Sequence, residues 1–107
     1  MLAVKLNVAN YEYDVHSLVK AFYPEETVKV ITPETKVETA EEALKEAGSA
    51  FLEIALTEEG ANITCDGNLH EWNYADADVR FKDGFKKFLY RVLCKETAKE
   101  LPWGNLT

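Results

Sequence analysis

The chain is short of the residues from which compact reaction centres are built. Its 107 residues include two cysteines, two histidines and five glycines. Cys65 and Cys94 are too few for a disulfide framework, and they supply too few soft ligands for a zinc site or an iron–sulfur cluster. Every glycine is isolated, which excludes a glycine-rich phosphate-binding loop. The sequence therefore predicts no catalytic, cofactor-binding or metal site within these residues.

Long apolar runs are missing as well. No run approaches the roughly 20 residues that a helix needs to cross a membrane. The opening residues 1–5 lack a basic segment followed by an apolar one, so we expect no signal peptide. We expect both thiols to be reduced and partly buried, and such thiols indicate a cytosolic protein.

The charge of the chain is acidic and unevenly distributed. The formal net charge is −7. Residues 1–79 include 16 acidic and 5 basic residues, whereas residues 80–107 include 3 acidic and 7 basic residues. An acidic body repels nucleic acid and anionic membranes at long range, so we expect neither as a partner. The basic C-terminal segment suits an acidic partner surface or the acidic part of its own domain.

Apolar periodicity predicts one α+β domain. Hydrophobic residues make up 47% of the chain, which is typical of a folded protein. Period-two alternation and β-branched residues predict strands near residues 2–7, 27–32, 50–57, 61–66 and 69–75. Helical spacing predicts helices near residues 14–23, 39–47 and 79–100. Because the last three strands follow one another directly, we expect a small, mainly antiparallel sheet with the helices on one face.

Local signals set the expected starts of the three helices. Asp14 is a good N-cap for the first helix, because its carboxylate can accept hydrogen bonds from free backbone N–H groups. Thr39 and Glu42 match a capping box for the second helix. Asp76 or Asp78 can cap the third.

Turn signals separate the remaining elements. Asp66-Gly67 is a strong signal for a two-residue hairpin. Gly48 is expected to end the second helix, since glycine adopts the left-handed conformation of a helix C-terminus. Residues 11–13 are expected to form a short strand ahead of the first helix.

Candidate catalytic residues are sparse. A metal or nucleophile site would need His70 and Cys65 to converge, with His16 as a further ligand. Alternation puts Cys65 on the apolar face of its strand, so we favour a buried structural thiol. The chain also contains several carboxylate pairs, which lie in expected turns and caps and which solvation and helix-dipole compensation explain. They are Glu25-Glu26, Glu41-Glu42, Glu58-Glu59 and Asp76 with Asp78.

Two surface patterns resemble nucleic-acid contacts. His70, Trp72 and Tyr74 share one strand face, but acidic neighbours argue for core packing or domain docking over base stacking. A basic row with helical spacing runs along the last expected helix, and we interpret it as a solvated face. The row comprises Lys87, Arg91, Lys95 and Lys99.

The C-terminal segment carries the most informative pattern. The long final helix is expected to lead into Leu101-Pro102-Trp103-Gly104-Asn105-Leu106-Thr107. This arrangement resembles a junction in HemZ-type proteins, the oxygen-independent coproporphyrinogen III oxidase-like (coproporphyrinogen dehydrogenase) radical SAM proteins. In that family a Trp-Gly-x-Leu-Thr stretch leads into the catalytic domain. Residues 11–15 and 18–24 also fit the family pattern, so the resemblance spans the chain.

The resemblance implies an accessory role for this chain. Residues 1–101 would form one non-catalytic α+β domain, and residues 102–107 would begin a linker into a downstream catalytic domain. Trp103, Gly104 and Leu106 would lie at the interface with that domain, which would be the partner that this one docks on or covers.

The resemblance also places the cofactors of the parent enzyme. A [4Fe–4S] cluster and S-adenosylmethionine would belong to a downstream Cys-x-x-x-Cys-x-x-Cys signature, which neither Cys65 nor Cys94 matches. The parent would be an oxidoreductase of haem and porphyrin biosynthesis that oxidatively decarboxylates porphyrinogen propionates. Two alternatives remain: a stand-alone α+β module that binds a ligand, peptide or RNA, and a small enzyme using His70 with nearby carboxylates.

Overall fold

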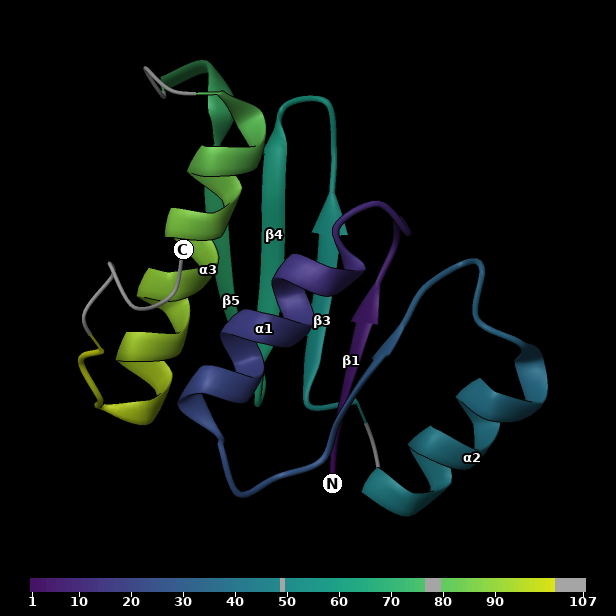
Figure 1. Cartoon of the computed structure of the whole chain (residues 1–107). Helices are drawn as coiled ribbons and strands as arrows, with labels where there is room; N and C mark the ends of the chain where they lie inside the picture. The colour runs from purple at the N-terminus through teal and green to yellow at the C-terminus, as the bar shows by residue number, and fades with distance from the viewer. Residues whose placement is uncertain (49, 77–79, 102–107) are drawn as a thin grey trace.

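A computed structural model describes residues 1–48, 50–76 and 80–101 (Figure 1). The strands are β1 (Leu2–Leu6), β2 (Val28–Ile31), β3 (Leu52–Leu56), β4 (Gly60–Cys65) and β5 (Asn68–Asn73). The helices are α1 (Glu12–Phe22), α2 (Val37–Ala47) and α3 (Phe81–Thr97), with a 3₁₀ turn at Tyr74–Asp76. Each of the five main strands expected from the sequence is present, with boundaries within two residues of those expected.

The strands form one mixed sheet in the order β2-β1-β3-β4-β5. β1 runs parallel to both of its neighbours, and β3, β4 and β5 form an antiparallel meander with longer ladders. The predicted α+β class is therefore confirmed. The parallel pairs arise because α1 and α2 each connect two strands that run in the same direction.

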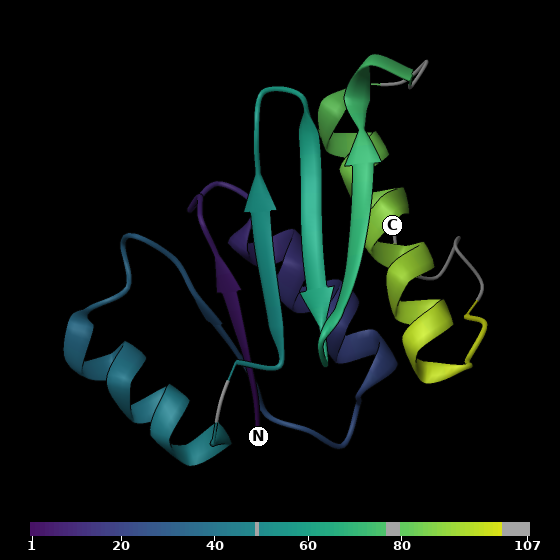
Figure 2. The same ribbon diagram turned by 180° about the vertical axis from the view of Figure 1, so that it is seen from behind.

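Two helices cover one face of the sheet. α1 and α3 lie together across that face in Figure 1. In the view from behind, none of the described helices lies over β3, β4 and β5 (Figure 2). α2 lies to the side, toward the edge where β2 runs, and contacts β1, so the expectation of three helices on one face holds only for α1 and α3. The two crossovers run across the sheet in opposite directions, and the right-handed rule therefore separates α2 from α1.

The core fills the space between the sheet and the two helices. α3 contributes its predicted apolar stripe, which packs against α1 and β4, and the inward residues of β1 and β3 belong to the same core cluster. The most deeply buried large side chains are Phe22, Phe85, Leu18, Leu52, Ile63, Leu89 and Leu93. α2 buries only Ala43, so it adds little to this core.

All three predicted helix starts differ from the structure. α1 begins at Glu12, so residues 11–13 are not a strand. Tyr11 packs its ring against Phe85, with centroids 5.6 Å apart, and this contact favours the extra helical turn. Asp14 therefore lies inside the first turn, where its carboxylate oxygens lie 3.6 and 3.8 Å from the ammonium groups of Lys82 and Lys86.

The other two helices also begin away from their predicted caps. α2 begins at Val37 without a side-chain cap, so Thr39 and Glu42 lie within the helix and form no capping box. α3 begins at Phe81 with Arg80 at its N-cap position. Asp76 closes the 3₁₀ turn, and Asp78 lies outside the described residues.

The predicted hairpin turn and the predicted end of α2 are confirmed, whereas α3 ends earlier than expected. Asp66 and Gly67 have positive φ angles of 51° and 85°, as a two-residue hairpin turn requires. Gly48 caps α2 with a φ of 83°. α3 ends at Thr97 instead of near residue 100, because Ala98 adopts the left-handed conformation.

The side chain of Asn7 extends the β1–β3 ladder by one step. Its amide nitrogen donates to the Leu56 carbonyl at 2.9 Å, and its oxygen accepts from the Leu56 N–H at 2.8 Å. The backbone N–H of Asn7 also donates to the Ile54 carbonyl. One side chain therefore takes the place of a strand residue at this end of the sheet.

We predict that Asn7→Ala lowers the free energy of unfolding by about 1–2 kcal/mol, because two exposed hydrogen bonds are lost. Asn62→Ala is the matched control, since Asn62 is an exposed strand residue whose side chain forms no hydrogen bond within the described ranges. Urea titration measures both. Equal losses for the two variants would show that the Asn7 bridge contributes nothing.

Gly60 lies in β4 directly against the backbone of β5. A Cβ atom added at Gly60 would lie 1.9 Å from the Trp72 carbonyl oxygen, whereas one added at Gly48 would meet nothing within 4 Å. The close approach requires glycine at position 60 because the obstacle is backbone and cannot rotate away.

Gly60→Ala should therefore destabilise the fold by more than about 2 kcal/mol, because the two strands must move apart. Gly48→Ala should cost only about 1 kcal/mol, the strain of a left-handed alanine. Thermal and urea unfolding of the two variants compare these costs, and a smaller loss for Gly60→Ala than for Gly48→Ala would contradict the close approach.

Candidate functional site

The sequence candidate His70 forms a hydrogen bond with Glu96 across the junction of β5 and α3. Its Nε2 atom lies 2.7 Å from Glu96 Oε1, and the two side chains are only 15% and 14% exposed. Asn68 approaches the same carboxylate, with its amide nitrogen 3.4 Å from both oxygens. Alternation along β5 turns Asn68 and His70 toward α3, while Leu69 between them faces outward and is 59% exposed.

Cys65 lies beside this pair on β4, opposite Asn68 in the sheet register. The thiol is buried, at 1% exposure, which confirms its predicted place on the apolar face. Burial, and then the carboxylates of Glu96 and Asp66, raise the pKa of Cys65 to about 11. Burial, followed by Cys65 and Glu96, also raises the pKa of Tyr23.

These shifts determine what the cluster can do. A cysteine attacks as its thiolate, and catalytic cysteines have a lowered pKa. The carboxylate that orients His70 lowers the stability of a Cys65 thiolate, so the three groups do not act as an activated thiol. The arrangement instead joins β5 to α3 through a largely buried hydrogen bond between His70 and Glu96.

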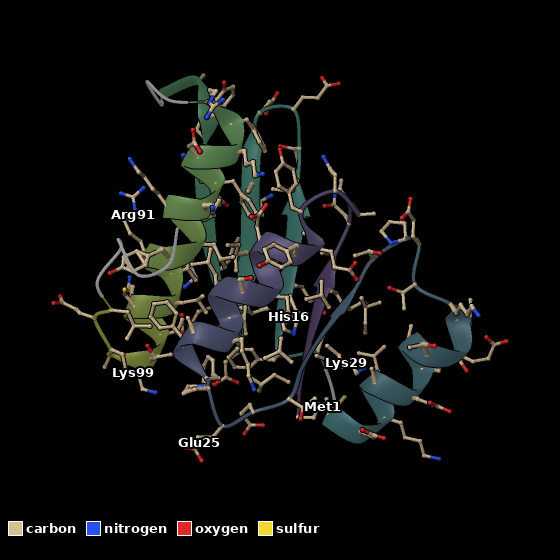
Figure 3. All side chains as sticks on the ribbon, viewed as in Figure 1. Met1, His16, Glu25, Lys29, Arg91 and Lys99 are labelled. Carbon is tan, nitrogen blue, oxygen red and sulfur yellow. The ribbon has the colours of Figure 1, made fainter. Side chains whose placement is uncertain are left out.

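His16 does not join this cluster. It is exposed on α1 and borders a groove with Val30 and Thr39, on the β2 side of the molecule. Figure 3 shows His16 on the same side as Lys29, away from Lys99 beyond the end of α3. Within the described ranges, no group of three or more His, Cys, Asp or Glu residues could hold a metal ion.

The described carboxylate pairs are exposed or serve as structural partners. Glu26 lies 3.0 Å from the amino group of Met1, and its carbonyl accepts a hydrogen bond from Lys20. The other described pairs, Glu41-Glu42 and Glu58-Glu59, are exposed. Their interpretation as solvated turn and helix residues agrees with this exposure.

The aromatic strand face packs against α3. The ring centroid of Trp72 lies 5.3 Å from that of Phe81 and 6.0 Å from that of Phe88. Tyr74 lies 5.1 Å from Phe81 in an edge-on arrangement. The interpretation of this stripe as core packing is therefore confirmed.

The four residues of the basic row have two different environments. Lys87, Arg91 and Lys95 are exposed on the helix. Lys99 follows the helix and turns back, where its ammonium group donates to the Phe22 carbonyl at 3.1 Å and lies 6.0 Å from the centre of the Tyr23 ring. Lys99 thus ties the end of α3 to the end of α1.

Leu101 is the last described residue of the chain. Its side chain packs against the core, and its carbonyl accepts a hydrogen bond from the Tyr90 hydroxyl. The expected interface residues Trp103, Gly104 and Leu106, and the rest of the expected linker 102–107, lie outside the described residues.

Sequence reasoning missed a depression on the helix-free face of the sheet. It has a volume of about 380 Å³, and its lining includes Lys5, Asn7, Glu53, Asn62 and Thr64. These outward residues alternate with the core residues of β1, β3 and β4. Their polar character was visible in the sequence, but only the strand order places them together.

Comparison of the chain with protein-family models, with curated proteins and with solved structures found no match. None of the helices that the structure describes combines the length and the apolar character that crossing a membrane requires.

We predict that His70 and Glu96 stabilise the fold jointly. A double-mutant cycle with His70→Gln and Glu96→Gln should give a coupling energy of about 1 kcal/mol, because the pair is largely shielded from water. The exposed Arg80–Asp83 pair, 89% and 47% exposed, is the control and should give a coupling near zero. Indistinguishable coupling energies for the two pairs would contradict a stabilising contact that is shielded from water.

The raised pKa of Cys65 predicts a loss of stability in alkali. The folded thiol keeps its proton up to about pH 11, whereas the unfolded thiol loses it near its ordinary pKa of 9.0. The free energy of unfolding should therefore fall as the pH rises from 9 to 11. Cys65→Ala should flatten this fall, and Cys94→Ala is the control. Equal slopes for Cys65→Ala and the unmodified chain would refute the assignment.

Proposed function

We propose that this chain forms a non-catalytic N-terminal domain of an oxygen-independent coproporphyrinogen III oxidase-like radical SAM protein. The parent protein would be an oxidoreductase of haem and porphyrin biosynthesis. In this proposal, the domain docks on or covers a downstream catalytic domain. The [4Fe–4S] cluster and S-adenosylmethionine belong to that domain, and the protein works in the cytosol.

The observation that carries the proposal concerns the place where the chain leaves the fold. α3 is packed into the core, and the contacts of Lys99 and Leu101 fix the chain beyond it. Directly after this anchor comes the Trp-Gly-x-Leu-Thr pattern that resembles the family junction. Because these contacts fix the position of the chain at Leu101, they support a domain that holds a following domain in a defined position.

The chemistry of the described site supports an accessory role. His70 and Glu96 are hydrogen-bonded to each other in a contact between β5 and α3, and the pKa of Cys65 is raised, away from the range of reactive thiols. These three residues are accounted for by stability, which leaves the reaction to the downstream domain.

The direct test is the sequence and chemistry of the polypeptide beyond Thr107. We expect a Cys-x-x-x-Cys-x-x-Cys signature there. After anaerobic reconstitution, the longer protein should bind iron and cleave S-adenosylmethionine, both with and without residues 1–101, whereas the 107-residue chain should bind no iron. A downstream sequence without the three cysteines, or stoichiometric iron on the 107-residue chain, would contradict the proposal.

The proposed interface makes a separate prediction. Trp103→Ala should lower the unfolding midpoint of the longer protein and leave that of the 107-residue chain unchanged, because the partner surface is present only in the former. Trp72→Ala is the control, since Trp72 packs on α3 and should destabilise both forms. An equal loss in both forms for Trp103→Ala would place Trp103 within this domain.

A second candidate function is a binding module that uses the helix-free face of the sheet. The polar depression around Lys5, Asn62 and Thr64 favours it, because it could accept a short peptide or a small polar ligand. Titration with peptide and metabolite panels tests this candidate, and Asn62→Leu should abolish any binding that occurs there.

A further inference from the structure

One face of α3 carries three positive charges that form no ion pair among the described residues. Lys87, Arg91 and Lys95 are exposed at intervals of four residues, and none forms an ion pair in the part of the chain that the structure describes. Like charges four residues apart destabilise a helix by about 0.2–0.5 kcal/mol per pair. The helix dipole offsets this cost for Lys95 in the last turn, but not for Lys87.

α2 carries the opposite row with the same spacing. Glu38, Glu42 and Glu46 are exposed, again four residues apart, and no ion pair is found for them among the described residues. Glu46 also lies near the C-terminal end of α2, where the helix dipole disfavours a negative charge. Both helices therefore carry repulsion that a complementary row would relieve.

The two rows cannot meet within one molecule. α2 lies to the side, toward the β2 edge of the sheet, and α3 lies over the opposite end near β5 (Figures 1 and 2). Successive charges in each row are separated by about 6 Å along the helix, because four residues rise 1.5 Å each. The rows thus match in spacing and are opposite in charge, but on one copy they belong to helices at opposite ends of the sheet.

We propose that the acidic row of α2 in one copy docks on the basic row of α3 in a second copy. The contact is head to tail, so repetition gives a ring or a filament. Contact between two helices is smaller than the 1,200–2,000 Å² typical of stable interfaces, so the association is weak and salt-sensitive.

The sparse packing of α2 within its own molecule supports a second copy of the chain as its partner. An isolated helix of fewer than about 12 residues is marginally stable in water. α2 has 11 residues and buries only Ala43, and the side chain of Val37 is 68% exposed. Docking on a second copy supplies α2 with contacts that its own sheet does not.

Sedimentation velocity of the 107-residue chain tests the proposal. At about 0.05 M salt the sedimentation coefficient should rise with protein concentration, and at about 0.5 M salt the rise should disappear. A base variant, Lys87→Glu with Arg91→Glu, should stay monomeric, and so should an acid variant, Glu38→Lys with Glu42→Lys. Mixing the two variants should restore association, because each then offers the row that the other lacks.

Matched controls separate local pairing from net charge and from misfolding. Lys5→Glu with Lys29→Glu changes the net charge as the base variant does, but on β1 and β2, and should keep the association. Lys87→Gln with Arg91→Gln provides a milder variant, and circular dichroism verifies the fold of each. A wild-type chain that stays monomeric at low salt, or variants that do not associate when mixed, would overturn the proposal. Neither result bears on the downstream catalytic domain.

Discussion

The packing of α3 against α1 and the sheet is the interaction on which the rest of the structure depends. Phe85, Leu89 and Leu93 of α3 are fully buried and meet the inward side chains of β4 and α1. Without this helix, the apolar face of the antiparallel meander would be open to water. The same packing orients Glu96 toward His70 and carries the chain to its anchored exit at Leu101.

A single arrangement therefore explains both the stability and the limited chemistry of the candidate site. The His70–Glu96 pair is shielded because α3 lies close to β5, and the burial of Cys65 beside it, followed by the carboxylates of Glu96 and Asp66, raises the pKa of Cys65. A histidine, a carboxylate and a thiol can together suggest catalysis, but in this fold they fasten two elements to each other. This is why the proposed function assigns the reaction to another domain.

Sequence reasoning predicted the elements well and their ends poorly. Strong periodicity located all five strands and the apolar stripe of α3, and the Asp66-Gly67 turn fixed the hairpin. The predicted N-cap of α1 failed because tertiary contacts override local preference: Tyr11 packs on Phe85, and Asp14 faces Lys82. The parallel pairing of β1 and the separate position of α2 depend on strand order, which no local pattern specifies. The meeting of His70 with Glu96, 26 residues apart, was invisible for the same reason.

Native-state hydrogen exchange tests most directly whether α3 is an integral part of the core. Buried amides of α3 and β4 should exchange only through global unfolding, with equal protection free energies, while α2 should exchange through a local opening of lower free energy. If α3 exchanged as readily as α2 while β4 stayed protected, α3 would be a detachable appendage, and the fold could not depend on its packing.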